Sequence, residues 1–142
     1  MVSVLLEQDM AYPVEKVWEI LGDFGNLGWI DGPERIEVIG EGVGMTRRVH
    51  MTGMDPIDEV LQSIDETKLS FSYAIPRGLP FPVKDYLSSV RLETKSSGTT
   101  TVYWSCTCEG IDDSMPDKDI QAILQGTYQQ MLDWLDAHLA SR

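Results

Sequence analysis

Cysteine is scarce in this chain, and its scarcity excludes two kinds of architecture. The 142 residues include only two cysteines, Cys106 and Cys108, which stand two positions apart in a strand-like segment. Side chains so close on one strand face are poorly placed for a disulfide, and they lack the companions that a metal site needs. We therefore expect no disulfide framework and no metal ion, and free thiols fit a reducing cytoplasm best. No cofactor is indicated either.

Basic residues are also few. The chain has 11 lysines and arginines against 23 aspartates and glutamates, which gives a formal net charge of -12 at pH 7. Nucleic-acid binding draws most of its affinity from the neutralisation of phosphates, so this balance argues against a nucleic-acid partner.

Long hydrophobic runs are absent. No apolar stretch approaches the length of a membrane-spanning helix, and Met1–Glu7 has neither the basic region nor the length of a signal peptide. We expect neither secretion nor membrane insertion.

Histidine is limited to two residues. His50 shares a strand face with Thr46 and Arg48 and is expected on the solvent side. His138 lies near the end of a predicted helix, where the helix dipole favours a positive charge. Neither residue fits the role of a catalytic base.

The residues that are present describe a single domain over residues 1–142, with 42% apolar and 24% charged content. The β-rich segment Val2–Ala11 ends at Tyr12 and Pro13, where a helix over Val14–Leu21 begins. The glycine-rich segment Gly22–Pro33 allows one further short helical turn. Short separators between six later strands imply an antiparallel meander. These strands are predicted over Glu34–Ile39, Met45–Met51, Ile57–Ile64, Lys68–Ile75, Lys84–Glu93 and Thr99–Glu109.

The chain closes with its longest helix, which is long enough to cross a sheet. Ser114 is predicted as its N-cap, with Asp117 three residues later in a variant of the capping box. Gly126 interrupts the middle of this helix, and we expect it to allow close approach of a strand or room beside a ligand.

Two opposite charges fall on the expected buried face of neighbouring strands. Alternation places Arg47 on the face of Val49, and Glu59 on the face of Leu61. A hairpin turn at Thr52–Asp55 sets the two charges opposite each other. A buried ion pair adds little net stability, because desolvation offsets most of the Coulomb gain. The pair therefore indicates a register-fixing contact, a wet internal cavity, or both.

The order and spacing of several short motifs resemble those of the START-like superfamily, which includes birch-pollen allergens, plant abscisic-acid receptors and bacterial polyketide cyclase/dehydrase-like (SRPBCC) proteins. The motifs are Tyr12–Trp18, Thr46–Val49, Glu59 with Leu61 and Asp65, Lys84–Tyr86, and Thr101–Trp104. The resemblance covers essentially the whole chain. It implies an α+β helix-grip fold, in which a curved seven-stranded antiparallel sheet wraps around the long C-terminal helix and two short helices follow the first strand.

The resemblance also implies an internal cavity for a hydrophobic ligand, which positions similar to Glu59 and Tyr86 line in the hormone receptors. The hormone-receptor role itself is not supported. The hairpin Met51–Ile57 is shorter than the receptors' gating loop, and no lysine lies between Phe24 and Pro33, where their carboxylate-binding lysine would fall.

The strand pattern proposes a cavity wall without reference to the family. The predicted ligand-binding residues are Trp29, Arg47, Glu59, Tyr73, Tyr86, Trp104, Thr127 and Met131. Trp29 is placed near the entrance, whereas for Tyr73, Tyr86 and Trp104 plain core packing is favoured over ligand contact. An apolar, aromatic hollow with a few convergent polar groups is typical of small-molecule sites.

Three functions remain open from the sequence. The first is binding of a small hydrophobic molecule that is lipid-like, polyketide-like or aromatic. The second is a lyase or isomerase of the cyclase or dehydratase kind, with Glu59 as the candidate proton acceptor or donor. The third is an acidic protein-interaction module. A homodimer is compatible with each of them.

Overall fold

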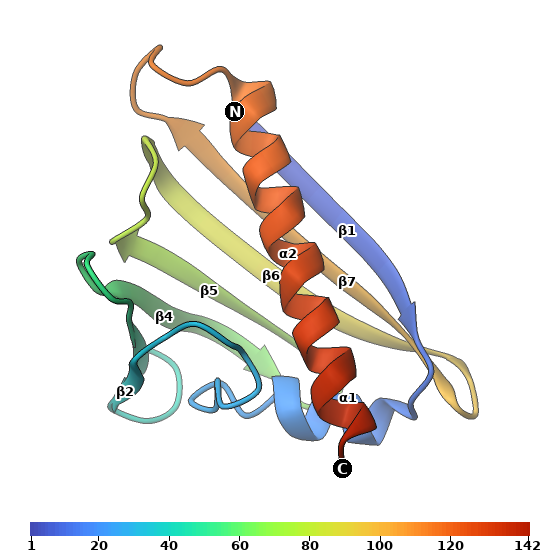
Figure 1. The fold of residues 1–142 in the computed structure, drawn as a ribbon. Coiled ribbons are helices and arrows are strands. Elements are labelled where there is room, and N and C mark those ends of the chain that lie inside the picture. The colour runs from blue at the N-terminus through green and yellow to red at the C-terminus, as the bar shows by residue number, and fades with distance from the viewer.

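The computed structural model describes residues 1–142, which form one sheet and two helices (Figure 1). The elements are β1 (Val2–Met10), α1 (Val14–Leu21), β2 (Arg35–Ile39), β3 (Thr46–His50), β4 (Ile57–Asp65), β5 (Ser70–Arg77), β6 (Val83–Ser96), β7 (Thr99–Gly110) and α2 (Asp117–Ala140). The fold class is α+β, as the sequence predicts.

The sheet has seven strands in the order β1-β7-β6-β5-β4-β3-β2, and every neighbouring pair is antiparallel. From β2 to β7 each strand pairs with the next strand along the chain, as the short separators predict. The first and last strands pair with each other, so β1 and β2 form the two edges.

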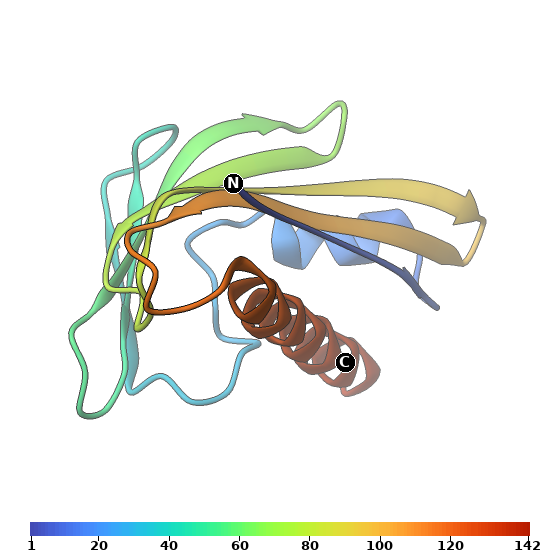
Figure 2. The ribbon, with the colours of Figure 1, turned by 90° about the horizontal axis from the view of Figure 1, so that it is seen from above.

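Helix α2 runs across one face of the sheet, and the sheet curves around it. Figure 1 shows α2 lying diagonally over the strands, and Figure 2 shows the β2–β3 end bending toward the side that α2 occupies. The buried residues of α2 recur every three or four positions, which gives the helix one apolar face. They are Ile120, Leu124, Tyr128, Leu132, Leu135 and Leu139. This arrangement is the helix-grip fold, and a single cluster of 27 buried residues fills it.

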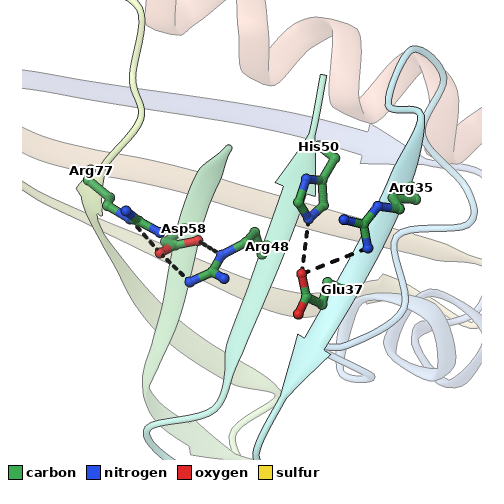
Figure 3. A network of polar contacts seen from close by, with 6 residues as sticks. All are labelled: Arg35, Glu37, Arg48, His50, Asp58 and Arg77. Carbon is green, nitrogen blue, oxygen red and sulfur yellow. Dashed lines mark hydrogen bonds and ion pairs between the residues drawn. The ribbon is translucent and has the colours of Figure 1, made fainter. Parts of the chain in front are cut away.

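The register of β3 on β4 joins opposite charges on both faces of the sheet. Arg47 pairs with Glu59 and Arg48 pairs with Asp58, as the hairpin predicts for the first pair. On the outer face, Arg48 donates two hydrogen bonds to Asp58, of 2.7 and 3.1 Å, and Arg77 donates a third of 2.8 Å (Figure 3). A slip by one residue would exchange the two faces, so these pairs specify the register.

The outer face also holds His50. Its Nε2 atom lies 3.0 Å from Glu37 Oε1, and Arg35 approaches the same carboxylate (Figure 3). His50 is on the solvent side, as predicted, but it is half-buried and bonded rather than free.

One of the two short helices predicted after the first strand is absent. Gly22–Pro33 forms turns instead, because its glycines and a local side-chain bond compete with a helix. Asn26 accepts a hydrogen bond from the Gly28 backbone N–H through its side-chain oxygen, and Gly32 has a φ of 112°.

The start of α2 also differs from the sequence prediction. Pro116 occupies the N-cap position and no side chain caps the helix, so Ser114 is not the N-cap. The Ser114 backbone N–H instead donates to Asp112 in the turn before the helix. Proline starts the helix without a capping bond, because its fixed φ suits the first turn.

Gly126 does not provide close packing. A side-chain carbon at this position would meet no atom within 4 Å, and the residue is exposed on the outer side of α2. Neither α1 nor α2 is long and apolar enough to cross a membrane.

Candidate ligand cavity

A cavity of about 320 Å³ lies between the sheet and the middle of α2. Strands β4 to β7, two loops and the helix supply its wall of 16 residues, of which 13 are hydrophobic. The lining consists of Met51, Met54, Ile57, Glu59, Tyr73, Ile75, Leu79, Pro80, Phe81, Tyr86, Trp104, Ile123, Leu124, Thr127, Tyr128 and Met131.

Two loops and the helix supply the apolar, partly exposed side of this wall. The β3–β4 hairpin contributes Met54, the β5–β6 loop contributes Leu79 and Phe81, and α2 contributes Ile123. Met54 and Ile123 keep 39% and 40% of their surface exposed, so apolar side chains reach solvent beside the cavity.

Gly78 allows the backbones of the two loops to come into contact. Its φ is 101°, and a side-chain carbon there would lie 2.6 Å from the Ile57 Cα atom and closer still to the Pro56 carbonyl oxygen. Only glycine fits such a contact, because the backbones touch where any other residue carries Cβ. The close approach holds the β5–β6 loop on the β3–β4 hairpin.

Glu59 is the one charged residue on the lining. Its Oε1 atom accepts a hydrogen bond of 2.6 Å from Arg47 Nε, and its side chain is 16% exposed. The carboxylate thus combines an ion pair with access to the cavity.

Arg47 lies behind this carboxylate and is not a lining residue. It is 3% exposed, and its Nη1 atom donates a 2.9 Å hydrogen bond to the Phe24 carbonyl oxygen. The guanidinium carbon lies 4.0 Å from the Phe24 ring centroid and 5.1 Å from the Tyr73 ring centroid, within the range of cation–π attraction.

Three buried tyrosines also carry polar atoms on the lining. The hydroxyls of Tyr86 and Tyr128 are hydrogen-bonded to each other, from β6 and α2 respectively. Burial raises the pKa of Tyr73 to about 12 and the pKa of Tyr86 and Tyr128 well above their usual range. All three therefore keep their protons near neutral pH.

Trp104 and the cysteines complete the surroundings. Trp104 Nε1 donates to Ser88 Oγ at 3.1 Å, and its ring stacks on Tyr128 with centroids 5.4 Å apart. Cys106 and Cys108 are free and buried, and burial raises the pKa of both thiols, that of Cys108 to about 11. Thiols held protonated in this way are poor nucleophiles.

The structure brings together six of the eight residues predicted from the sequence. Glu59, Tyr73, Tyr86, Trp104, Thr127 and Met131 all line the cavity. Arg47 does not, for the reason given above. Trp29 does not line the cavity either: it is a core residue, 6% exposed, and its Nε1 atom donates to the Asn26 carbonyl oxygen within the same turn.

The sequence pattern missed most of the loop residues on the lining. Met54 and Leu79–Phe81 lie in connections whose direction the strand period does not specify. The proline-rich composition after β5 was the one available signal, since it excludes a simple tight hairpin there.

A metal centre is not formed by these residues. No group of three or more histidine, cysteine, aspartate or glutamate side chains lies close enough together to hold a metal ion. The chemistry that the cavity offers is an apolar wall, one carboxylate and several protonated hydroxyls.

The fold is shared by many solved structures. Protein XoxI from Bacillus cereus aligns with a TM-score of 0.85 and 25% identity, covering 99% of this chain and 96% of that one. Ara h 8.0201 aligns with a TM-score of 0.78 and 19% identity, covering 99% and 98%. Norcoclaurine synthase from Thalictrum flavum, in complex with dopamine and hydroxybenzaldehyde, aligns with a TM-score of 0.78 and 16% identity, covering 99% and 87%.

Of the two sequence comparisons, the one with family models agrees with these structures. A search of curated proteins finds no match. The family model described as polyketide cyclase / dehydrase and lipid transport matches residues 1–140. This match spans nearly the whole chain and agrees with the helix-grip fold, so the protein belongs to the polyketide cyclase/dehydrase and lipid transport family.

Proposed function

We propose that this protein binds one small, largely apolar molecule in the cavity between the sheet and α2. The observation that carries the proposal is the lining itself, 13 hydrophobic residues among 16 around about 320 Å³. Small-molecule sites in proteins are mostly apolar hollows of roughly 300 to 1,000 Å³ with a few placed polar groups. The cavity is at the small end of this range, which favours a compact molecule.

Two comparisons support this function. The family is described by polyketide chemistry and lipid transport, both of which involve largely apolar molecules. Norcoclaurine synthase has the same fold and has been solved with dopamine and hydroxybenzaldehyde, two small aromatic compounds. A lipid-like, polyketide-like or aromatic ligand fits the wall of this cavity on the same chemical grounds.

A cyclase or dehydratase reaction is the second candidate function. The position of the Glu59 carboxylate on the cavity lining favours it. A carboxylate on an apolar wall is suited to taking a proton from a bound molecule. The lining tyrosines are unsuited as bases, because burial raises the pKa of Tyr73, Tyr86 and Tyr128. An enzyme of this kind would therefore depend on Glu59 for proton transfer.

Binding can be tested with prodan, a neutral naphthalene dye whose emission reports an apolar environment. We expect saturable binding with one site per chain. Thr127→Trp should weaken binding at least about tenfold, because the indole would project from the lining of α2 into the space of the ligand. Ala122→Trp is the matched control, because Ala122 is exposed and outside the lining.

Equal binding by the two tryptophan variants would place the dye elsewhere and contradict the proposal. Native mass spectrometry of freshly purified protein provides an independent reading. A bound molecule retained in the native spectrum and lost on denaturation identifies the chemical class to test for turnover.

A further inference from the structure

We propose that the cavity selects apolar molecules that carry one O–H or N–H donor and rejects carboxylates, with Glu59 as the recognising group. The inference rests on the proposed binding function and adds the chemical class of the ligand. It follows from which polar atoms on the lining remain available.

The charge that a ligand can reach on the lining is the negative charge of Glu59. Glu59 Oε1 accepts from Arg47 Nε, and no N–H or O–H of the protein donates to Oε2. A carboxylate oxygen without a donor, on a wall that is otherwise apolar, favours a ligand that brings its own donor. Hydrogen bonds to charged groups are also stronger than neutral ones.

The nearest positive charge cannot receive a ligand carboxylate. Arg47 is 3% exposed and does not line the cavity. Glu59 and the Phe24 carbonyl oxygen occupy its Nε and Nη1 atoms, and the Phe24 ring lies 4.0 Å from its guanidinium carbon. An anionic ligand would therefore meet the carboxylate of Glu59 before it met the guanidinium.

The remaining polar side chains of the lining, among them the protonated hydroxyl of Tyr73, supply no cation. Thr127 donates its hydroxyl to the Ile123 carbonyl oxygen, and Trp104 donates to Ser88. Tyr86 and Tyr128 are hydrogen-bonded to each other. A fatty acid or another carboxylate would thus lose its hydration without gaining a charged partner, which is a large penalty.

Three naphthalenes of nearly equal shape test the inference. Naphthol carries a donor, methoxynaphthalene carries an acceptor alone, and naphthoate carries a carboxylate on the same ring carbon. Each competes with prodan for the unaltered protein. We expect naphthol to displace prodan at about tenfold lower concentration than methoxynaphthalene. Naphthoate should fail to displace it at about a hundredfold the concentration of naphthol.

The Glu59→Gln variant should weaken the discrimination against a negative charge. Removal of the carboxylate abolishes its repulsion of an anionic ligand, so naphthoate should gain affinity by about tenfold or more. Naphthol should lose its advantage over methoxynaphthalene, because the charged acceptor is gone. Glu7→Gln is the matched control, because Glu7 is exposed and its side chain makes no hydrogen bond or ion pair. This control should keep the preferences of the unaltered protein.

The outcomes separate the two proposals. If neither prodan nor any naphthalene binds, the proposed function fails and the ligand class fails with it. If prodan binds but naphthol and methoxynaphthalene compete equally, or naphthoate competes as well as naphthol, the ligand class alone is overturned. These comparisons use the unaltered protein, so they decide the question even if Glu59→Gln does not fold.

Discussion

Arg47 is the residue on which the charged end of the cavity depends. Its guanidinium is bonded to Glu59 and to the Phe24 carbonyl oxygen, and it packs against two aromatic rings. Removal of one partner of a buried pair leaves the other charge without compensation, and this is more costly than replacing both partners by apolar residues.

Arg47→Met should therefore lower the free energy of unfolding by about 3 to 5 kcal/mol, as measured by urea denaturation. Arg47→Met combined with Glu59→Leu should recover more than half of this loss, because no unpaired carboxylate remains. The control is Arg91→Met, since Arg91 pairs with Glu93 and lies over the Tyr103 ring at the surface. The exposed pair should cost at most about 1 kcal/mol. Equal losses at Arg47 and Arg91 would contradict the special role of the buried pair.

At the scale of the elements, two glycines have opposite roles. Gly126 lies on the outer side of α2 with open space around it, whereas Gly78 holds two loops in backbone contact. The same substitution, glycine to alanine, should therefore change stability in opposite directions at these positions.

Gly126→Ala should stabilise the protein by about 0.5 to 1 kcal/mol. Alanine lowers the conformational entropy of the unfolded chain and favours the helix, and the added methyl group meets no neighbour within 4 Å. A higher midpoint of thermal unfolding is the expected result. A lower midpoint would show that the glycine has a packing role that its open surroundings do not indicate.

Gly78→Ala should destabilise the protein by at least about 1 to 3 kcal/mol, which is the usual cost of backbone strain at a left-handed position. The clash with Pro56 and Ile57 adds to this cost and should loosen the loops beside the cavity. Chemical denaturation measures the loss. Gly98→Ala is the control, because Gly98 has ordinary φ and open space around it, and a similar loss there would argue against the loop contact.

At the scale of the whole molecule, buried and paired ionisable groups limit stability at both ends of the pH range. The Arg48 guanidinium beside Asp58 lowers the pKa of that carboxyl in the folded state. The unfolded state then binds more protons in acid, so this contribution is present above about pH 4 and is lost as pH falls further. The pKa shift of Tyr73 has the opposite sign, because burial raises its folded pKa to about 12. Its contribution to stability is therefore present below about pH 10 and is lost above it.

The free energy of unfolding, measured against pH, should fall at both the acid and the alkaline end of the range. We expect Asp58→Asn to reduce the loss of stability between about pH 5 and pH 3, because the group that takes up the proton is gone. We expect Tyr73→Phe to reduce the loss between about pH 10 and pH 12 in the same way. Urea denaturation across this range measures both slopes, and slopes that match the unaltered protein would assign the acid and alkaline limbs to other groups.

The sequence by itself determined the period-2 and period-3.6 patterns and therefore most of the fold. Arg47 opposite Glu59 followed from alternation and a short hairpin, and the structure confirms this pairing. Alternation also predicts Tyr73, Tyr86 and Trp104 on the inner face, and all three line the cavity. Such predictions succeed because side-chain direction along a strand is a local property of the backbone.

Tertiary structure alone decided which inner-face residues border the cavity and which fill the core. Arg47 and Glu59 share one face and one hydrogen bond, yet only Glu59 reaches the lining, because the Phe24 carbonyl and ring hold the guanidinium away from it. The glycine-rich composition around Trp29 predicts a place near the entrance, but the turn that replaces a second helix directs this side chain into the core. The paths of the loops and the position of the helix depend on contacts between residues far apart in the chain, so the local period of the sequence does not predict them.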